Sequence, residues 1–281
     1  MTVKLNKGTA ATRDFYNREG WRRENGTLVD TLLFDFQDGP INRALYDWRK
    51  DRLRQMAGGP GLRLADLGCG GAPATFLADQ CTTFTAVDFS ATGLAEAAAA
   101  LEDANVPFET VEADITGLPF DDETFDVVYS AQTIYHIDTA DGQAAALHEA
   151  MRVVRPGGRA LFVLGNPFPL LFPYRLIRRV LAMTPGLNTV LNRLRRTPPL
   201  PYLPMPSGWV KGRLQKWGDV KITGYAVPSL EFDRRVSEHS MIGRIAWRAI
   251  RWLETHHPDH AAWLGCYVLI VVYKAKSDVT A

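Results

Sequence analysis

The stretch Leu64-Ala65-Asp66-Leu67-Gly68-Cys69-Gly70-Gly71-Ala72 runs from an apolar strand through an acid into a glycine turn, and Pro73 follows it. A second apolar run, Thr85-Ala86-Val87-Asp88-Phe89, reaches another acid 22 residues after the first. Glycines let the backbone turn sharply and let a ligand come close to bare N–H groups. Together the two runs predict a floor for an adenosine-containing cofactor at the carboxyl ends of two parallel strands.

The composition is that of a globular protein with a packed core. The chain has 281 residues, of which 46% are hydrophobic and 10% aromatic. Its net charge of +1 hides an asymmetry, because the segment 151–218 holds twelve Lys and Arg and no acid, whereas the rest of the chain holds 20 basic and 31 acidic residues. This basic segment indicates either an anionic partner, such as a substrate group or a membrane surface, or solvated arginines on helix faces.

The cysteines and the amino terminus argue for a reducing, cytoplasmic location. Cys69, Cys81 and Cys266 have no CxxC spacing, so neither a disulfide framework nor a zinc site is predicted. Residues 1–10 lack the apolar region of a signal peptide. No uncharged apolar stretch reaches the roughly 18 residues that a membrane-spanning helix needs.

Strand and helix patterns alternate from residue 62 onward. Strands are predicted at 62–67, 83–88, 107–112, 125–130, 159–165, 219–227 and 266–274. Helices are predicted at 41–56, 73–80, 91–104, 141–154, 208–217 and 237–255, with Ser90 as the N-cap of the third. This alternation predicts an α/β fold, a doubly wound, mostly parallel sheet of seven strands with helices on both faces.

Four regions divide the chain. Residues 1–57 are predicted to form a mostly helical cap and residues 58–165 the cofactor-binding core. Residues 166–206 contain nine of the 17 prolines, among aromatic, aliphatic and basic residues, and are predicted to be a lid over the crevice. Residues 207–281 supply the closing strands and helices of the same sheet.

Two details discriminate between possible cofactors. A dinucleotide fingerprint needs G-x-G-x-x-G/A, and here Pro73 takes the third position. Asp66 would repel a pyrophosphate on the turn, but it suits the ammonium group of a methionine moiety. The charge balance therefore favours S-adenosylmethionine over a nicotinamide cofactor.

At this point the chain resembles the class I S-adenosylmethionine-dependent methyltransferases, in the broad group that includes quinone-biosynthesis enzymes. Five segments carry the resemblance, in family order: 64–72, Asp88, 112–115, 118–128 and 152–158. The resemblance implies a Rossmann-like methyltransferase fold. It also implies that cofactor contacts come from Asp66, Gly68, Gly70, Asp88, Phe89, Asp114, Ile115 and Ser130, with Asp88 on the ribose, Asp114 and Ile115 at the adenine, and Ser130 at the methionine part.

His136, just past the fourth strand, is the candidate catalytic base, because an imidazole suits proton removal at neutral pH. The alternative is that it only shapes the pocket. The candidate substrate contacts are Tyr16, Tyr135, Phe172, Tyr202 and His239, and Tyr16 could also favour the sulfonium charge. No metal is predicted, and His256, His257 and His260 are expected on a solvated loop.

The lid residues predict the acceptor class. Their aromatic side chains lie among prolines and aliphatics, which favours a wall for a hydrophobic small molecule over a nucleic-acid groove. We expect a secondary metabolite, quinone, polyketide or terpenoid acceptor, with O-methylation slightly favoured over C-methylation. Peripheral membrane contact through the basic lid is possible by this argument. Two alternatives stay open: a nicotinamide-dependent oxidoreductase, and a non-catalytic cofactor-binding protein.

Overall fold

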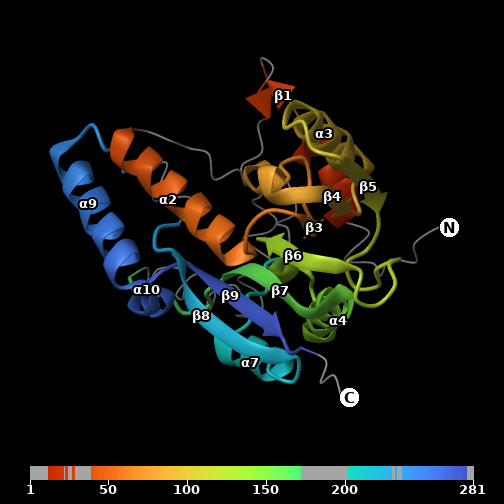
Figure 1. The fold of residues 1–281 in the computed structure, drawn as a ribbon. Coiled ribbons are helices and arrows are strands. Elements are labelled where there is room, and N and C mark those ends of the chain that lie inside the picture. Colours follow the sequence, from red (N-terminus) through yellow and green to blue (C-terminus); the bar gives the residue numbers. More distant parts are fainter. Residues whose placement is uncertain are drawn as a thin grey trace, which may run out of the picture.

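One sheet of seven strands forms the centre of the protein (Figure 1). The computed structural model describes residues 12–21, 23–24, 27–28, 39–171, 201–229, 232 and 236–276. The strands are β3 (Leu62–Leu67), β4 (Cys81–Asp88), β5 (Phe108–Glu112), β6 (Phe125–Ala131), β7 (Val154–Gly165), β8 (Gly218–Ala226) and β9 (Tyr267–Lys274). Their order is β5-β4-β3-β6-β7-β9-β8. The predicted fold class is confirmed.

Strands β5, β4, β3, β6 and β7 are parallel to one another, whereas β9 is antiparallel to both β7 and β8. The register pairs Asp66 with Ala86 and Asp88 with Glu112. Since parallel strands end at one edge of a sheet, β3 and β4 bring Asp66 and Asp88 to the same edge.

Alternate side chains of the strands enter two separate cores. On β3, Leu64 packs with α2 (Pro40–Ala57), the 3-10 helix η2 (Thr75–Gln80) and α3 (Ala91–Asp103). Ala65 points the other way, to the core under α4 (Ala140–Val153) and α7 (Ser207–Leu214). Figure 1 shows these two sets of helices on opposite sides of the sheet. Both sheet faces are buried, which explains the nearly continuous apolar strands.

Helix boundaries follow local capping. The Ser90 hydroxyl accepts from the Gly93 N–H at 3.1 Å, as predicted for an N-cap. The helix expected at 73–80 begins at Thr75, because the Asp66 carboxylate accepts the Ala74 N–H ahead of it. The helix expected from 237 begins at Met241, where Ser240 supplies the cap.

The described part of the amino-terminal region is mostly helical, with one short strand pair that the sequence did not predict. A helical turn at residues 12–15 and the π-helix η1 (Tyr16–Gly20) precede a short antiparallel pair, β1 (Arg23–Glu24) and β2 (Thr27–Leu28). The long helix α2 follows, and Glu238 caps it from 197 residues away by accepting the Ile41 N–H at 3.0 Å.

Helix α9 (Met241–His256) packs on α2 through a buried ion pair. The Arg49 guanidinium donates to both carboxylate oxygens of Glu254, at 2.8 and 2.7 Å. Glu254 also accepts the Val227 N–H at 2.7 Å. Trp247 and Ile250 pack beside this pair with Leu45. The short helix α10 (Pro258–Leu264) then leads into β9.

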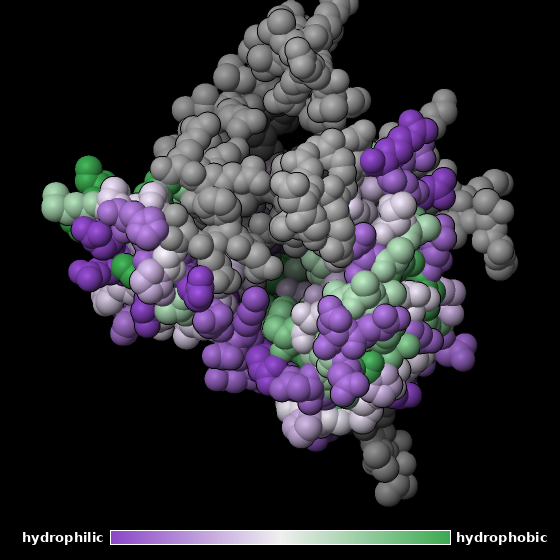
Figure 2. Space-filling view, turned by 90° about the horizontal axis from the view of Figure 1, so that it is seen from above, coloured by the Kyte–Doolittle hydropathy of each residue, from purple (hydrophilic) through white to green (hydrophobic). Residues whose placement is uncertain are grey.

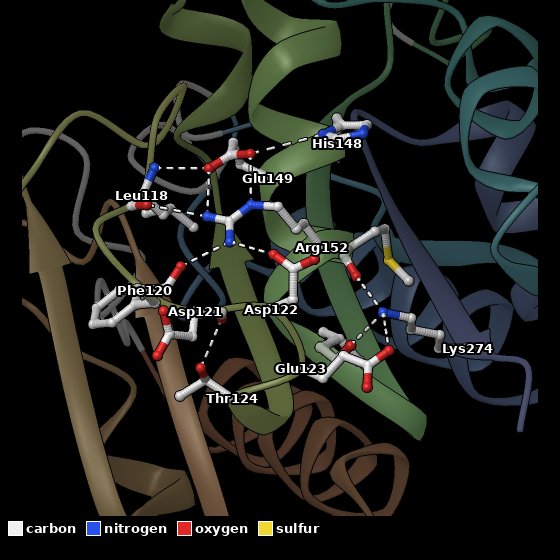
Figure 3. A network of polar contacts seen from close by, with 12 residues as sticks. Leu118, Phe120, Asp121, Asp122, Glu123, Thr124, His148, Glu149, Arg152 and Lys274 are labelled. Carbon is white, nitrogen blue, oxygen red and sulfur yellow. Dashed lines mark hydrogen bonds and ion pairs between the residues drawn. The ribbon is translucent and has the colours of Figure 1, made fainter. Parts of the chain in front are cut away.

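A polar network holds the loop before β6 (Figure 3). The Arg152 guanidinium of α4 binds Glu149 and Asp122 and donates to the carbonyls of Leu118 and Phe120. The Arg152 side chain lowers the pKa of Glu149, chiefly by this hydrogen bond. Lys274 of β9 donates to the Val154 carbonyl at 2.6 Å. Lys274 also pairs with Glu123 of the loop at 3.9 Å, so these contacts fasten both α4 and the end of β9 to the loop.

Among the described helices, none is long and apolar enough to cross a membrane.

Candidate functional site

A cavity of about 580 Å³ opens at the carboxyl ends of β3, β4 and β6. This volume falls in the range of small-molecule and cofactor sites, roughly 300–1,000 Å³. Nine of the predicted site residues line it: Tyr16, Asp66, Gly68, Gly70, Asp88, Phe89, Asp114, Ile115 and His136. Residues from three parts of the sequence therefore meet at one edge of the sheet.

The glycine turn is shaped by two residues in left-handed conformations. Gly68 and Gly70 have φ angles of 71° and 55°, a backbone conformation that residues with a side chain rarely adopt. A Cβ on Gly70 would lie 2.1 Å from the Trp21 ring, and a Cβ on Gly68 would lie 2.1 Å from the Thr133 side chain. Space and conformation both require glycine here.

Asp88 holds the turn in place. One carboxylate oxygen accepts the Gly70 N–H and the other accepts the Ser90 N–H, each at 2.8 Å. Burial raises the pKa of Asp88 to about 6, and these N–H donors oppose the shift. Each oxygen keeps a second lone pair, so the carboxylate can still accept hydroxyl groups of a ligand.

Asp66 is the second buried acid of the cavity wall. Its carboxylate accepts the Ala74 N–H at 2.8 Å. Burial raises the pKa of Asp66 to about 7, and the nearby charge of Asp88 adds to the shift. A cationic ligand group beside Asp66 would offset this desolvation and favour the charged carboxylate. This acid suits an ammonium group and opposes a pyrophosphate.

Aromatic rings form another wall of the cavity. The Tyr16 ring stacks on Trp21 with 5.6 Å between ring centroids and lies 6.3 Å from the Phe89 ring. Trp21 also lies against Gly70 and Gly71. The sequence did not predict that Trp21 lies at the cavity. The one feature that could have indicated it is its place five residues after Tyr16.

His136 lines the cavity, and its two ring nitrogens have different surroundings. Its Nδ1 lies 2.7 Å from the Pro201 carbonyl, which can only accept, so Nδ1 carries the proton. In the neutral ring Nε2 is then an acceptor, and this atom is buried with no hydrogen-bond partner among the described residues. Burial lowers the pKa of His136. This shift favours the neutral form of the imidazole.

The remaining predicted site residues lie elsewhere. Ser130 does not line the cavity, because its hydroxyl turns to the Leu67 carbonyl at 2.8 Å and ties β6 to β3. Its neighbours Ala131 and Gln132 line the cavity instead. Tyr135 is buried behind the cavity, where its ring packs against that of Tyr202, 5.0 Å away between centroids.

His239 is exposed near the start of α9 and does not reach the cavity. Phe172 lies outside the described residues, as does most of the predicted lid. Two of the three histidines expected on a loop are helical, because His256 ends α9 and His260 lies on α10; His257 lies between the two helices. The described residues contain no group of three or more His, Cys, Asp or Glu side chains placed to hold a metal ion.

The far end of the cavity has a lining that the sequence did not indicate. Tyr46 and Lys50 come from α2, Phe76 from η2, Tyr129 from β6 and Tyr225 from β8. Tyr46 and Lys50 are four residues apart on one helix face, which was the only local signal. Their approach to the cavity depends on how α2 packs on the sheet.

Known proteins with similar sequences are methyltransferases. Residues 65–162 match the family model described as "Methyltransferase domain". The demethylmenaquinone methyltransferase of Mycobacterium tuberculosis (strain H37Rv) is 38% identical over 115 residues, which cover 41% of this chain and 45% of that protein. The chain thus matches less than half the length of this curated relative.

Solved structures share the fold across nearly the whole chain. The geranyl diphosphate C-methyltransferase of Streptomyces coelicolor A3(2), solved with S-adenosylhomocysteine, has a TM-score of 0.60 at 14% identity and covers 97% of this chain and 100% of that one. The [4+2]-cyclase SpnF has a TM-score of 0.53 at 18% identity, covering 82% and 81%. At these identities the likeness concerns the fold alone.

Three observations point to the same kind of protein: the strand order of the sheet, the two acids at the strand ends that line the cavity, and the match of residues 65–162 to the family model. Residues 65–162 therefore match a methyltransferase domain, and the chain is similar in this region to a quinone-biosynthesis methyltransferase and in its fold to an enzyme solved with S-adenosylhomocysteine.

Proposed function

We propose that this protein transfers the methyl group of S-adenosylmethionine to a hydrophobic small molecule, and that His136 accepts the proton of the acceptor. The observation that carries this proposal is that His136 lines the cavity while its Nδ1–H is held by the Pro201 carbonyl, which leaves the buried Nε2 as the lone-pair acceptor of the ring. When bound, the cofactor supplies an electrophilic methyl group on a positively charged sulfur.

The chain's own residues fit this cofactor. Asp88 is placed for the ribose hydroxyls and Asp66 for the ammonium group, and both carboxylates line the cavity. Asp114 and Ile115 lie on the same wall for the adenine, and the stacked rings of Tyr16 and Trp21 offer π faces to a sulfonium. A pyrophosphate beside Asp66 would meet a negative charge, which argues against the nicotinamide alternative.

His136 would act as general base. A hydroxyl or acidic C–H of the acceptor would give its proton to Nε2, and the Pro201 carbonyl would stabilise the imidazolium through Nδ1–H. Such a base contributes on the order of 10²–10⁴-fold to the rate. We favour an oxygen acceptor, because one base next to an aromatic wall is sufficient for a phenol-type hydroxyl.

The lining supports a hydrophobic acceptor. Phe76, Tyr129, Ile137 and Tyr225 supply apolar surface, and Lys50 supplies a cation for an acidic substituent. We infer that the acceptor is a quinone-like, polyketide or terpenoid molecule. Residues 201–206, the described end of the proposed lid, are held near the cavity by the hydrogen bond from the Leu203 N–H to the Tyr135 carbonyl at 2.8 Å.

Two measurements test this function. S-adenosylhomocysteine should raise the thermal unfolding temperature, whereas NAD and NADP should not; the reverse result would favour the oxidoreductase alternative. Formation of S-adenosylhomocysteine is then followed with a panel of phenolic, quinol and terpenoid acceptors. No turnover with any of them, despite tight binding, would favour the non-catalytic alternative.

His136→Gln tests the base. We expect turnover of a hydroxyl acceptor to fall by about 10²–10⁴-fold while affinity for S-adenosylhomocysteine stays unchanged. His148→Gln is the matched control, because His148 is half-exposed on α4 and lies outside the cavity lining. Equal activity of the two variants would show that His136 only shapes the pocket.

A further inference from the structure

The outward face of α9 is apolar and exposed. Met241, Ile242, Ile245 and Trp252 are 70%, 76%, 62% and 55% exposed. They recur at helical spacing and form one stripe along the helix. A soluble protein seldom exposes several large apolar side chains side by side unless they contact a partner.

The inward face of the same helix is fully packed against the rest of the protein. Trp247 and Ile250 pack against α2, and Glu254 is paired with Arg49. The exposed stripe is therefore not needed to hold α9 in place. The left margin of Figure 2, the side on which α9 lies in Figure 1, shows hydrophobic residues beside strongly hydrophilic ones.

The hydrophilic residues of this face are arginines. Arg244, Arg248 and Arg251 alternate with the apolar stripe, and all three are exposed. Within the described part of the chain, no ion pair involves any of them. The only acid of α9 is Glu254, which is buried on the other side. The face therefore carries positive charge without negative charge.

Helix α10, which follows α9, exposes another large apolar side chain. Trp263 is 74% exposed, and its carbonyl accepts the Leu170 N–H at 3.4 Å. Phe168, Leu170 and Leu171, at the start of the proposed lid, are exposed too. The Trp252 ring lies 4.7 Å from that of His257, so the stripe on α9 runs up to the start of α10.

We propose that the outward face of α9 binds the surface of an anionic phospholipid bilayer. A basic amphipathic helix with tryptophan at its border can lie in the interface plane, its apolar side chains among acyl chains and its arginines at the headgroups. A second copy of this chain fits less well. In a two-fold dimer the same patch meets itself, and the three arginines would face three arginines.

Co-sedimentation of the full chain with vesicles tests this proposal. We expect binding to phosphatidylcholine vesicles that contain phosphatidylglycerol and much weaker binding to phosphatidylcholine alone. Arg248→Gln/Arg251→Gln should weaken binding to the anionic vesicles by about 25-fold, because each arginine near such a surface contributes about fivefold. Ile242→Ser/Ile245→Ser should weaken binding to both kinds of vesicle.

The matched control removes two positive charges elsewhere. Lys211→Gln/Arg213→Gln changes α7, where both residues are exposed, and should leave vesicle binding unchanged. Equal losses for the two charge variants would overturn the assignment to α9. Binding without preference for anionic vesicles would also overturn it. So would a dimer in light scattering that Ile242→Ser/Ile245→Ser dissociates, since α9 would then be an interface between copies.

Discussion

Replacing Arg49 by Met isolates the energy of the buried contact between α2 and α9. The Arg49 and Glu254 side chains are 2% and 1% exposed, and two hydrogen bonds of 2.8 and 2.7 Å join them. Met keeps the length and packing of the Arg stem but removes the charge. The variant therefore leaves the Glu254 carboxylate buried without its cation.

The structure sets the size of the expected loss. Breaking a buried pair by removing one partner costs about 3–5 kcal/mol. Glu254 keeps one donor, because the Val227 N–H remains 2.7 Å from its carboxylate. We therefore expect the lower end of that range, about 3 kcal/mol of the free energy of unfolding.

Urea denaturation followed by circular dichroism measures this loss, and a second substitution tests its cause. Arg49→Met/Glu254→Gln removes both charges while the Gln carbonyl can still accept the Val227 N–H. We expect the double variant to regain most of the loss and to lie within about 1 kcal/mol of the parent chain. Asp79→Asn, which disrupts the exposed Arg54–Asp79 pair, should cost less than about 1 kcal/mol.

The reasoning fails if Arg49→Met costs no more than Asp79→Asn. It also fails if the double variant is less stable than Arg49→Met alone. Either result would mean that the contact acts through packing and not through the compensation of a buried charge.

Two further predictions concern the cavity. Burial raises the pKa of Asp66 to about 7, so between about pH 4 and about pH 7 the folded chain holds a proton at Asp66 that the unfolded chain has lost. The contribution of Asp66 to stability is therefore greatest below this window and falls as pH rises through it. Asp66→Asn should flatten this slope in urea titrations across the window, and an unchanged slope would assign it to other groups. Gly70→Ala places a methyl group 2.1 Å from Trp21 in a backbone conformation with φ of 55°, so we expect at least tenfold weaker binding of S-adenosylhomocysteine by calorimetry. Gly117→Ala, where a Cβ would meet nothing within 4 Å, is its control, and equal affinities of the two variants would contradict the steric argument.

The resemblance to known methyltransferases rests on segments with two different roles. Asp66, Gly70 and Asp114 line the cavity. The run 118–124 does not reach it; Arg152 and Lys274 fasten this loop and the helix after it to the sheet. A motif in the sequence therefore indicates the family without indicating which of its residues contact a ligand.

Local patterns in the sequence were sufficient for the strands, most helices and the cofactor floor. Strand alternation, the glycine turn and the Ser90 cap depend on residues only a few positions away, so the local sequence is sufficient to predict them. The acids Asp66 and Asp88 could be placed together because both end parallel strands, and such strands end at one edge.

Only the tertiary structure decided which hydrogen-bond partners the side chains of the site have. The tautomer of His136 depends on a carbonyl 65 residues away, and the cap of α2 depends on Glu238, 197 residues from its partner. Ser130 turned away from the cavity because the Leu67 carbonyl of the adjacent strand needed a donor. Hydrogen-bond partners distant in sequence follow from packing, which no local pattern encodes. The meeting of Asp66 and Asp88 at one sheet edge was therefore predictable, while the tautomer of His136 and the outward face of α9 were not.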